Sequence, residues 1–196
     1  MKDGTKTNGY FHSLVISIIL LFAVPGLASA QIDSLPARND TAILIKSKIM
    51  PESRTLWVHL PPDYNTTTNS YPVLYVLDGD SHFQQASTAA DFLAGYDRDR
   101  IPAMIVVGIT NVDRGRDLTP IHPQLSSSET DSVTVLKTSG AGRFLRYIDE
   151  EVIPYVDLHY RVAPYRILMG HSLAGLFALY VKETKPDLFH AIVKVR

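Results

Sequence analysis

The chain alternates short apolar runs with amphipathic segments over most of its length. Between residues 41 and 60, apolar positions recur at every second residue on both sides of a Pro-Glu-Ser turn, a pattern that predicts two strands of a hairpin. Residues 73–77 and 103–107 are continuously apolar, which is typical of strands buried on both faces of a parallel sheet. Residues 82–96 between these runs predict a helix, so the three segments form a βαβ unit.

The second half of the chain predicts further layers of the same fold. Residues 111–138 are polar and lack a period, so we expect a long loop. Phe144, Ile148 and Val152 recur at helical spacing and predict an amphipathic helix over 143–156, which Pro154 should kink or end. A strand, a helix and a last strand are then predicted at 166–169, 173–182 and 191–195. The fold class is therefore an α/β sandwich with a mostly parallel central sheet and antiparallel N-terminal strands.

The first thirty residues have the three parts of a secretory signal peptide. Lys2 and Lys6 precede an apolar run over residues 14–24, and the small residues Ala28-Ser29-Ala30 follow it. The run is short of the roughly 20 residues that a membrane span needs, although an uncleaved N-terminal anchor is the alternative. We expect cleavage near Ala30, export to the periplasm or the medium, and a single domain over residues 31–196.

The composition excludes several classes of protein. The chain has 196 residues, of which 45% are hydrophobic and 20% charged, as in an ordinary globular protein. Its formal net charge of −1 gives no basic footprint, so we expect neither a nucleic-acid partner nor, after signal cleavage, a membrane partner. The absence of cysteine from the sequence excludes disulfides, thiolate zinc sites and a cysteine nucleophile.

One serine stands between a predicted strand and a predicted helix. The segment is Gly170-His171-Ser172-Leu173-Ala174-Gly175. A sharp strand-to-helix turn of this kind exposes the serine oxygen and directs the following N–H groups at one point, where they can stabilise an oxyanion. Ala174 stands where the strict G-x-S-x-G pattern has glycine, and its extra methyl group makes this a tolerated variant. The structural alternative is that Ser172 merely caps the helix.

A second turn follows the predicted strand at 73–77. Its sequence is Asp78-Gly79-Asp80, and Gly79 should permit a backbone turn that other residues resist. The N–H of Asp80 would then be free to serve as a second oxyanion donor. The alternative is an ordinary strand-to-helix turn in which Asp78 caps the helix.

Taken together, residues 74–83, 116–120, 144–154 and 170–179 resemble the esterase family of α/β-hydrolases. That family includes esterase D-like enzymes, feruloyl esterases, siderophore esterases and mycolyltransferases, and the resemblance is strongest to the exported siderophore-esterase-like branch. It extends from Thr41 to Val193 and implies a small-molecule ester as substrate and no cofactor or metal. It also implies that Ser172 is the nucleophile, with the N–H groups of Leu173 and Asp80 as the oxyanion hole. Residues 116–120 would lie near the substrate rim, without an assigned chemical role.

The sequence does not supply an obvious partner for Ser172. A nucleophilic serine needs a histidine base and an orienting acid, which follow the serine in α/β-hydrolases. Only 24 residues follow Ser172, and they contain Glu183, Asp187 and His190. The predicted topology places Asp187 and His190 at the opposite edge of the sheet. We therefore expect the sequence to cover the N-terminal two-thirds of such an esterase and to be weakly active or inactive. A non-catalytic binding protein and an acyltransferase of the same family are the alternative functions.

Overall fold

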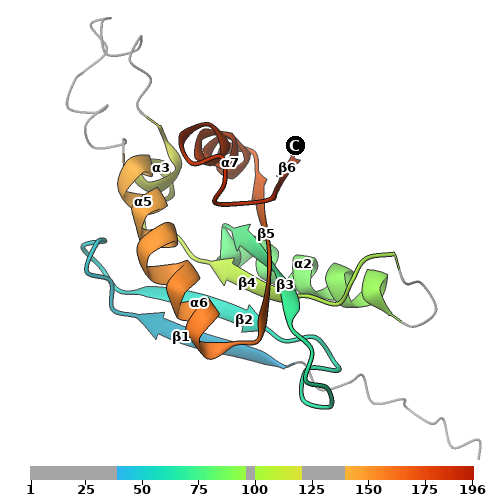
Figure 1. Cartoon of the computed structure of the whole chain (residues 1–196). Helices are drawn as coiled ribbons and strands as arrows, with labels where there is room; N and C mark the ends of the chain where they lie inside the picture. The colour runs from blue at the N-terminus through green and yellow to red at the C-terminus, as the bar shows by residue number, and fades with distance from the viewer. Residues whose placement is uncertain (1–38, 96–99, 121–139) are drawn as a thin grey trace, which may run out of the picture. The chain divides into compact units, whose positions relative to one another are not determined.

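The computed structural model describes residues 39–95, 100–120 and 140–196. The predicted signal peptide and most of the predicted loop at 111–138 lie outside these residues. Six strands form one sheet in the order β1-β2-β4-β3-β5-β6 (Figure 1). The strands are β1 (Asp40–Ile45), β2 (Arg54–His59), β3 (Tyr71–Leu77), β4 (Ile105–Ile109), β5 (Val162–His171) and β6 (Ala191–Val195). The helical segments are α2 (Gly79–Ala94), α3 (Arg114–Leu118), α5 (Ala141–Tyr147), the π-helical turn η2 (Ile148–Val152), α6 (Ile153–His159) and α7 (Leu173–Thr184).

The sheet has the predicted mixture of strand directions. β1 and β2 form an antiparallel hairpin, and β2 also runs antiparallel to β4. β4, β3, β5 and β6 are parallel to one another. The predicted α/β sandwich, with a mostly parallel sheet and antiparallel N-terminal strands, is thus confirmed. Because β3 and β5 are neighbours, the turns that follow them lie at the same edge of the sheet, which we call the carboxyl edge.

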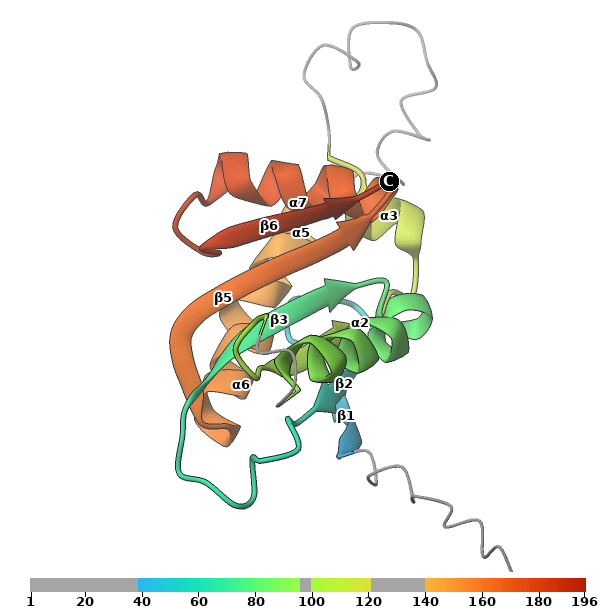
Figure 2. The ribbon, with the colours of Figure 1, turned by 90° about the vertical axis from the view of Figure 1, so that its right-hand side faces the viewer.

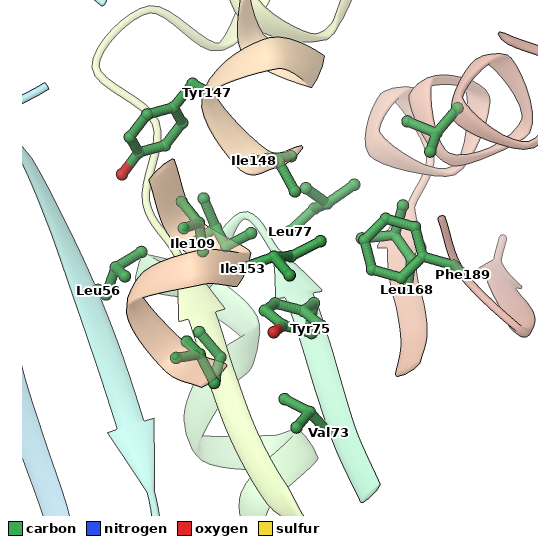
Figure 3. Close-up of a cluster of buried hydrophobic side chains, with 14 of the residues drawn as sticks. Leu56, Val73, Tyr75, Leu77, Ile109, Tyr147, Ile148, Ile153, Leu168 and Phe189 are labelled. Atoms are coloured by element: carbon green, nitrogen blue, oxygen red, sulfur yellow. The ribbon is translucent and has the colours of Figure 1, made fainter. Parts of the chain in front are cut away.

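The two faces of the sheet are covered by different helices (Figure 2). On one face, α2 packs Phe83, Ala86 and Ala90 against Val76 and Val106 of the central strands. The other face carries the larger core, to which α5, η2, α6 and α7 contribute. Figure 3 shows this core, with Tyr75 and Leu77 of β3 beneath Ile148 and Ile153 of the helical layer. Nonpolar strands covered on both sides explain the continuous apolar runs of the sequence.

Two helices differ from the prediction. α2 begins at Gly79, three residues before the predicted start, because the chain turns at once after β3. α3 lies within the segment that was predicted to be a loop. It has five residues, too few to display a helical period, and it is capped by the Asp113 side chain, which accepts a hydrogen bond from the Arg116 N–H.

Of the two outcomes predicted for Pro154, a kink or an end of the helix, the structure excludes the end. The helical layer continues to His159, and the turn before the proline is π-helical, with the Ile153 N–H donating to the Ile148 carbonyl. Pro154 therefore falls in the first turn of α6, where a residue without an N–H is tolerated. A π-helical turn inserts one extra residue, which lets the chain pass the proline without a break in the layer. Within the described residues, no helix is both long enough and apolar enough to cross a membrane.

Candidate active site

Ser172 occupies the turn between β5 and α7 with a backbone conformation that side chains rarely adopt. Its φ is 54° and its ψ is −115°. Two of the described residues other than glycine have a positive φ, namely Ser172 and Asp78. Backbone strain of this kind costs about 1–3 kcal/mol and is common at functional sites. The Ser172 side chain is exposed and makes no capping hydrogen bond to α7, so the alternative that it merely caps this helix lacks its defining contact.

Gly170 makes the sharp turn possible. A Cβ atom at this position would lie 2.3 Å from the Ala174 carbonyl oxygen and 2.8 Å from the Gly175 nitrogen. The first turn of α7 therefore rests directly on the backbone of β5. Ala174 itself is fully buried within the helix, and the structure accommodates its methyl group. The Ser172 N–H donates to the Val195 carbonyl oxygen at 3.1 Å, which joins the elbow to β6.

The turn after β3 differs in detail from the prediction. Asp78, rather than Gly79, takes the left-handed conformation, with φ 52° and ψ 47°. Gly79 is needed for a different reason, since a Cβ there would lie 2.7 Å from the Gly108 carbonyl carbon of β4. Asp78 makes no capping hydrogen bond to α2, so the capping alternative fails here as well. Asp80 is the second residue of α2, where backbone N–H groups have no partner within the helix.

The Asp78 carboxylate is held from the segment that follows β4. Asn111 donates to its Oδ1 at 2.5 Å, and the Arg114 guanidinium donates to both carboxylate oxygens at 3.0 and 2.9 Å. These hydrogen bonds raise the pKa of Arg114 above its ordinary value, although desolvation opposes the shift. Arg114 Nη2 also reaches the His171 carbonyl oxygen at 3.4 Å. Arg114 therefore connects the turn after β3 to the elbow that carries Ser172.

A cavity of about 250 Å³ opens at this carboxyl edge. The His82 ring borders the cavity and lies 5.2 Å from the His171 ring, centroid to centroid. The cavity is thus next to the elbow. Its lining residues are Asp78, Asp80, Ser81, His82, Asn111, Val112 and Arg114.

The segment 116–120 does not line this cavity. Arg116 turns away from it and donates to Glu52, while Asp117 is fully buried against Arg54. The prediction that residues 116–120 lie near the substrate rim is therefore not supported by this cavity, and sequence reasoning missed Arg114, which does line it. The sequence feature that could have indicated Arg114 is its position in a short polar stretch after a buried strand.

Histidines of the described residues lie at both edges of the sheet. His82 and His171 lie at the carboxyl edge. Of the histidines that the structure describes, His59 is the one hydrogen-bonded to carboxylates, and it bridges Asp40 and Asp91 at the opposite edge. His190 accepts a hydrogen bond from the Arg166 N–H and stacks on Tyr165 of β5. It therefore lies away from the elbow, as predicted. Across residues 39–95, 100–120 and 140–196, no group of three or more His, Asp or Glu side chains is suited to hold a metal ion.

Comparison with known proteins identifies the family. Residues 47–194 match the family model described as Putative esterase. The chain belongs to this esterase family. It is 32% identical to the ferri-bacillibactin esterase BesA of Bacillus subtilis, over 98% of this chain and 64% of that protein. Membership confirms the resemblance that the motifs at 74–83 and 170–179 indicated.

Solved structures of related esterases share the fold. An IroE-like serine hydrolase from Shewanella oneidensis superposes with a TM-score of 0.70 at 34% identity, covering 78% of this chain and 49% of that one. The siderophore hydrolase EstA from Aspergillus nidulans gives a TM-score of 0.64 at 28% identity, covering 80% and 57%. The chain thus spans between about half and two-thirds of the length of these relatives.

Proposed function

We propose that the protein is an exported serine esterase that cleaves small-molecule carboxylic esters through an acyl-enzyme on Ser172. The observation that carries this proposal is the Ser172 backbone, with φ 54° and ψ −115° at the end of β5 and no capping bond to the helix that follows. Membership of the esterase family supports hydrolase chemistry. Two relatives bear the names of siderophore-cleaving enzymes, so siderophore esters are the first substrates to test.

In the proposed reaction, the Ser172 oxygen attacks the ester carbonyl carbon and gives up its proton to a general base. The negative charge that develops on the carbonyl oxygen is stabilised by the N–H groups of Leu173 and Asp80, each contributing about 3–4 kcal/mol. Collapse of this intermediate breaks the bond to the leaving oxygen, which takes the proton back from the base, so the alcohol departs and the acyl group stays on Ser172. Water then cleaves the acyl-enzyme and releases the acid. The base and its orienting acid are not assigned to a described residue.

Export is proposed from the first thirty residues alone. The basic start, the apolar run at 14–24 and the Ala28-Ser29-Ala30 site support cleavage near Ala30. N-terminal sequencing of the protein recovered from its producing cells would show a start near Gln31. A start at Met1 in a membrane fraction would favour the uncleaved anchor instead.

The nucleophile is tested with a fluorophosphonate probe, which forms a covalent bond to reactive serines. We expect slow labelling of the purified chain at Ser172, located by peptide mass spectrometry, and complete loss of labelling in Ser172→Ala. Ser70→Ala, which removes an exposed serine outside the site, should label like the parent chain. No labelling of the parent chain, or equal labelling of Ser172→Ala, would contradict the assignment. In parallel assays with a siderophore ester, formation of a new ester from an added alcohol would indicate an acyltransferase.

A further inference from the structure

Helix α3 places Arg114 at the site, yet it cannot hold its own position. The helix spans Arg114–Leu118, and isolated helices of fewer than about 12 residues are marginal in water. Arg114, its first residue, contacts Asp78 and the His171 carbonyl oxygen. The location of this arginine therefore depends on what anchors the other end of α3. Figure 1 shows α3 beside α5, above the end of the sheet that carries the site.

The other end of α3 is anchored by a buried ion pair. Asp117 Oδ2 lies 2.7 Å from Arg54 Nη1, and both side chains are fully buried. Arg54 comes from the first position of β2, and its guanidinium packs against the rings of Phe144 and Tyr147 of α5, at 5.3 and 5.8 Å from the ring centroids. One side chain thus links β2, α5 and α3.

Two further charges extend this pair. Arg116 Nε donates to Asp117 Oδ1 at 2.9 Å, and Arg116 Nη2 donates to Glu52 Oε1 at 2.5 Å. The same Glu52 oxygen accepts from Arg54. The charges alternate around a closed ring of two arginines and two carboxylates, so each charge has two partners of opposite sign. Such a ring fixes the rotation of α3 as well as its distance from β2, because contacts come from two successive residues of the helix.

We propose that Asp117 and Arg54 are positioning residues of the active site. By fixing α3, they keep Arg114 in contact with both the Asp78 turn and the elbow, and so hold the proposed oxyanion donors Asp80 and Leu173 in one arrangement. This inference rests on the proposed function. A buried ion pair is weak evidence for stability, because apolar residues of similar volume often replace it without loss. What an apolar pair does not reproduce is the direction of the contacts that orient α3.

The test uses the double variant Arg54→Met/Asp117→Leu, together with Asp117→Asn. The double variant fills the same space without burying an uncompensated charge. It should therefore fold even if Asp117→Asn, which leaves Glu52 as the one carboxylate partner of the buried Arg54, does not. The matched control is Arg146→Ala/Glu150→Ala, which removes an exposed ion pair of the neighbouring helical layer. Circular dichroism melts establish which variants are folded.

The first readout is independent of activity. The sequence has no cysteine, so Val112→Cys and Leu158→Cys, both at exposed positions, allow two spin labels to be attached selectively. Val112 lies just before α3 and Leu158 lies in α6, so the distribution of distances between the labels reports the position of α3. We expect a single narrow distribution in the parent and the control, and a broadened or shifted one in the double variant.

The second readout is the rate of fluorophosphonate labelling of Ser172 as a function of probe concentration. We expect the maximal rate of the double variant to fall about tenfold or more, because small displacements of catalytic groups are costly. The probe concentration that gives half of the maximal rate should be unchanged, since Arg54 and Asp117 do not contact the probe. If a folded double variant keeps the parental distances and rate, the pair is only filling the core and the inference is wrong. Absence of labelling in the parent would contradict the proposed function instead, while the label distances would still decide the position of α3.

Discussion

At the scale of single residues, the site combines two strained turns on neighbouring strands. Asp78 after β3 and Ser172 after β5 both have positive φ angles. Each is held by contacts from outside its own turn, Asp78 by Asn111 and Arg114 and Ser172 by the Val195 carbonyl. Strain of about 1–3 kcal/mol per residue persists only where such contacts impose it. The two turns therefore depend on the surrounding structure for their conformation.

Gly170→Ala should destabilise the protein by about 1–3 kcal/mol, the usual cost of overpacking. The added methyl group would lie 2.3 Å from the Ala174 carbonyl oxygen, which belongs to the backbone of α7 and cannot move aside. Gly142→Ala is the matched control, because its methyl group would meet only the Tyr180 hydroxyl at 3.6 Å and alanine favours a helix. Urea unfolding of both variants checks the prediction. Equal stability of the two would show that β5 and α7 separate more easily than their contact indicates.

The sequence was sufficient to predict the two strand-to-helix turns, because these depend on local order. Ser172 and Asp80 each follow an apolar run and precede a helix, a pattern that is visible within about ten residues of the chain. The contacts of Arg114 were not predictable in this way. Its partners Asp78 and His171 are distant in the sequence, and nothing near Arg114 specifies them. The same holds for the pairing of Asp117 with Arg54.

At the scale of elements, length decided which segments could be predicted. The strands and the longer helices have enough residues to display a period, and the structure confirms them. α3 was missed because five residues display none. The sequence does not decide between a kink and an end of the helix at Pro154, for another reason. A π-helical turn is a response of the backbone to packing, and the side-chain pattern carries no sign of it.

Three elements meet at His59, and their association should depend on pH. The imidazole of His59 in β2 contacts Asp40 of β1 at 2.6 Å and Asp91 of α2 at 3.0 Å. Burial alone would lower the pKa of His59, but the hydrogen bonds to Asp91 and Asp40 outweigh it and raise the pKa above its ordinary value. The folded protein therefore favours the protonated ring. Its contribution to stability is fully present below about pH 6.5, the ordinary histidine pKa, and is lost as the pH rises through the folded-state pKa.

His59→Gln should accordingly cost most stability near pH 5.5 and less at pH 9. Hydrogen bonds to charged groups contribute about 1.5–3 kcal/mol each, so the difference from the parent is measurable at the lower pH. Urea unfolding of both proteins across this range gives the difference at each pH. His159→Gln serves as the control. Among the described residues, the contacts of His159 are with the carbonyl oxygen and the ring of Tyr155 in its own helix, and neither is charged. A difference that is constant with pH would contradict a protonated His59.

At the scale of the whole molecule, the sheet of the described residues ends at β1 and β6. The last strand, β6, pairs only with β5, and it carries Val193 with 43% of its surface exposed. Leu176 and Leu179 of the adjoining α7 are also exposed. An open strand edge with apolar side chains is prone to pair with other chains. This surface is therefore one part of the described molecule at which we expect self-association.

Val193→Lys should reduce self-association of the chain, because a charged side chain on an edge strand opposes pairing with another edge. The average mass from light scattering at increasing protein concentration should stay nearer to that of a monomer than in the parent. Leu158→Lys adds the same charge at an exposed position of α6, away from β6, and should leave the mass unchanged. If both variants behave alike, net charge rather than the edge of β6 controls association.

The hydrogen bond between the Ser172 N–H and the Val195 carbonyl bears on the order in which the protein folds. The β1–β2 hairpin and the βαβ unit join residues that are close in sequence, whereas β5 must find β3 across the whole middle of the chain. Pairings between distant segments form slowly, since the entropy of closing the intervening loop opposes them. β6 can add only after β5 is in place. The strained turn at Ser172 should therefore form late, and a partly folded chain would lack it.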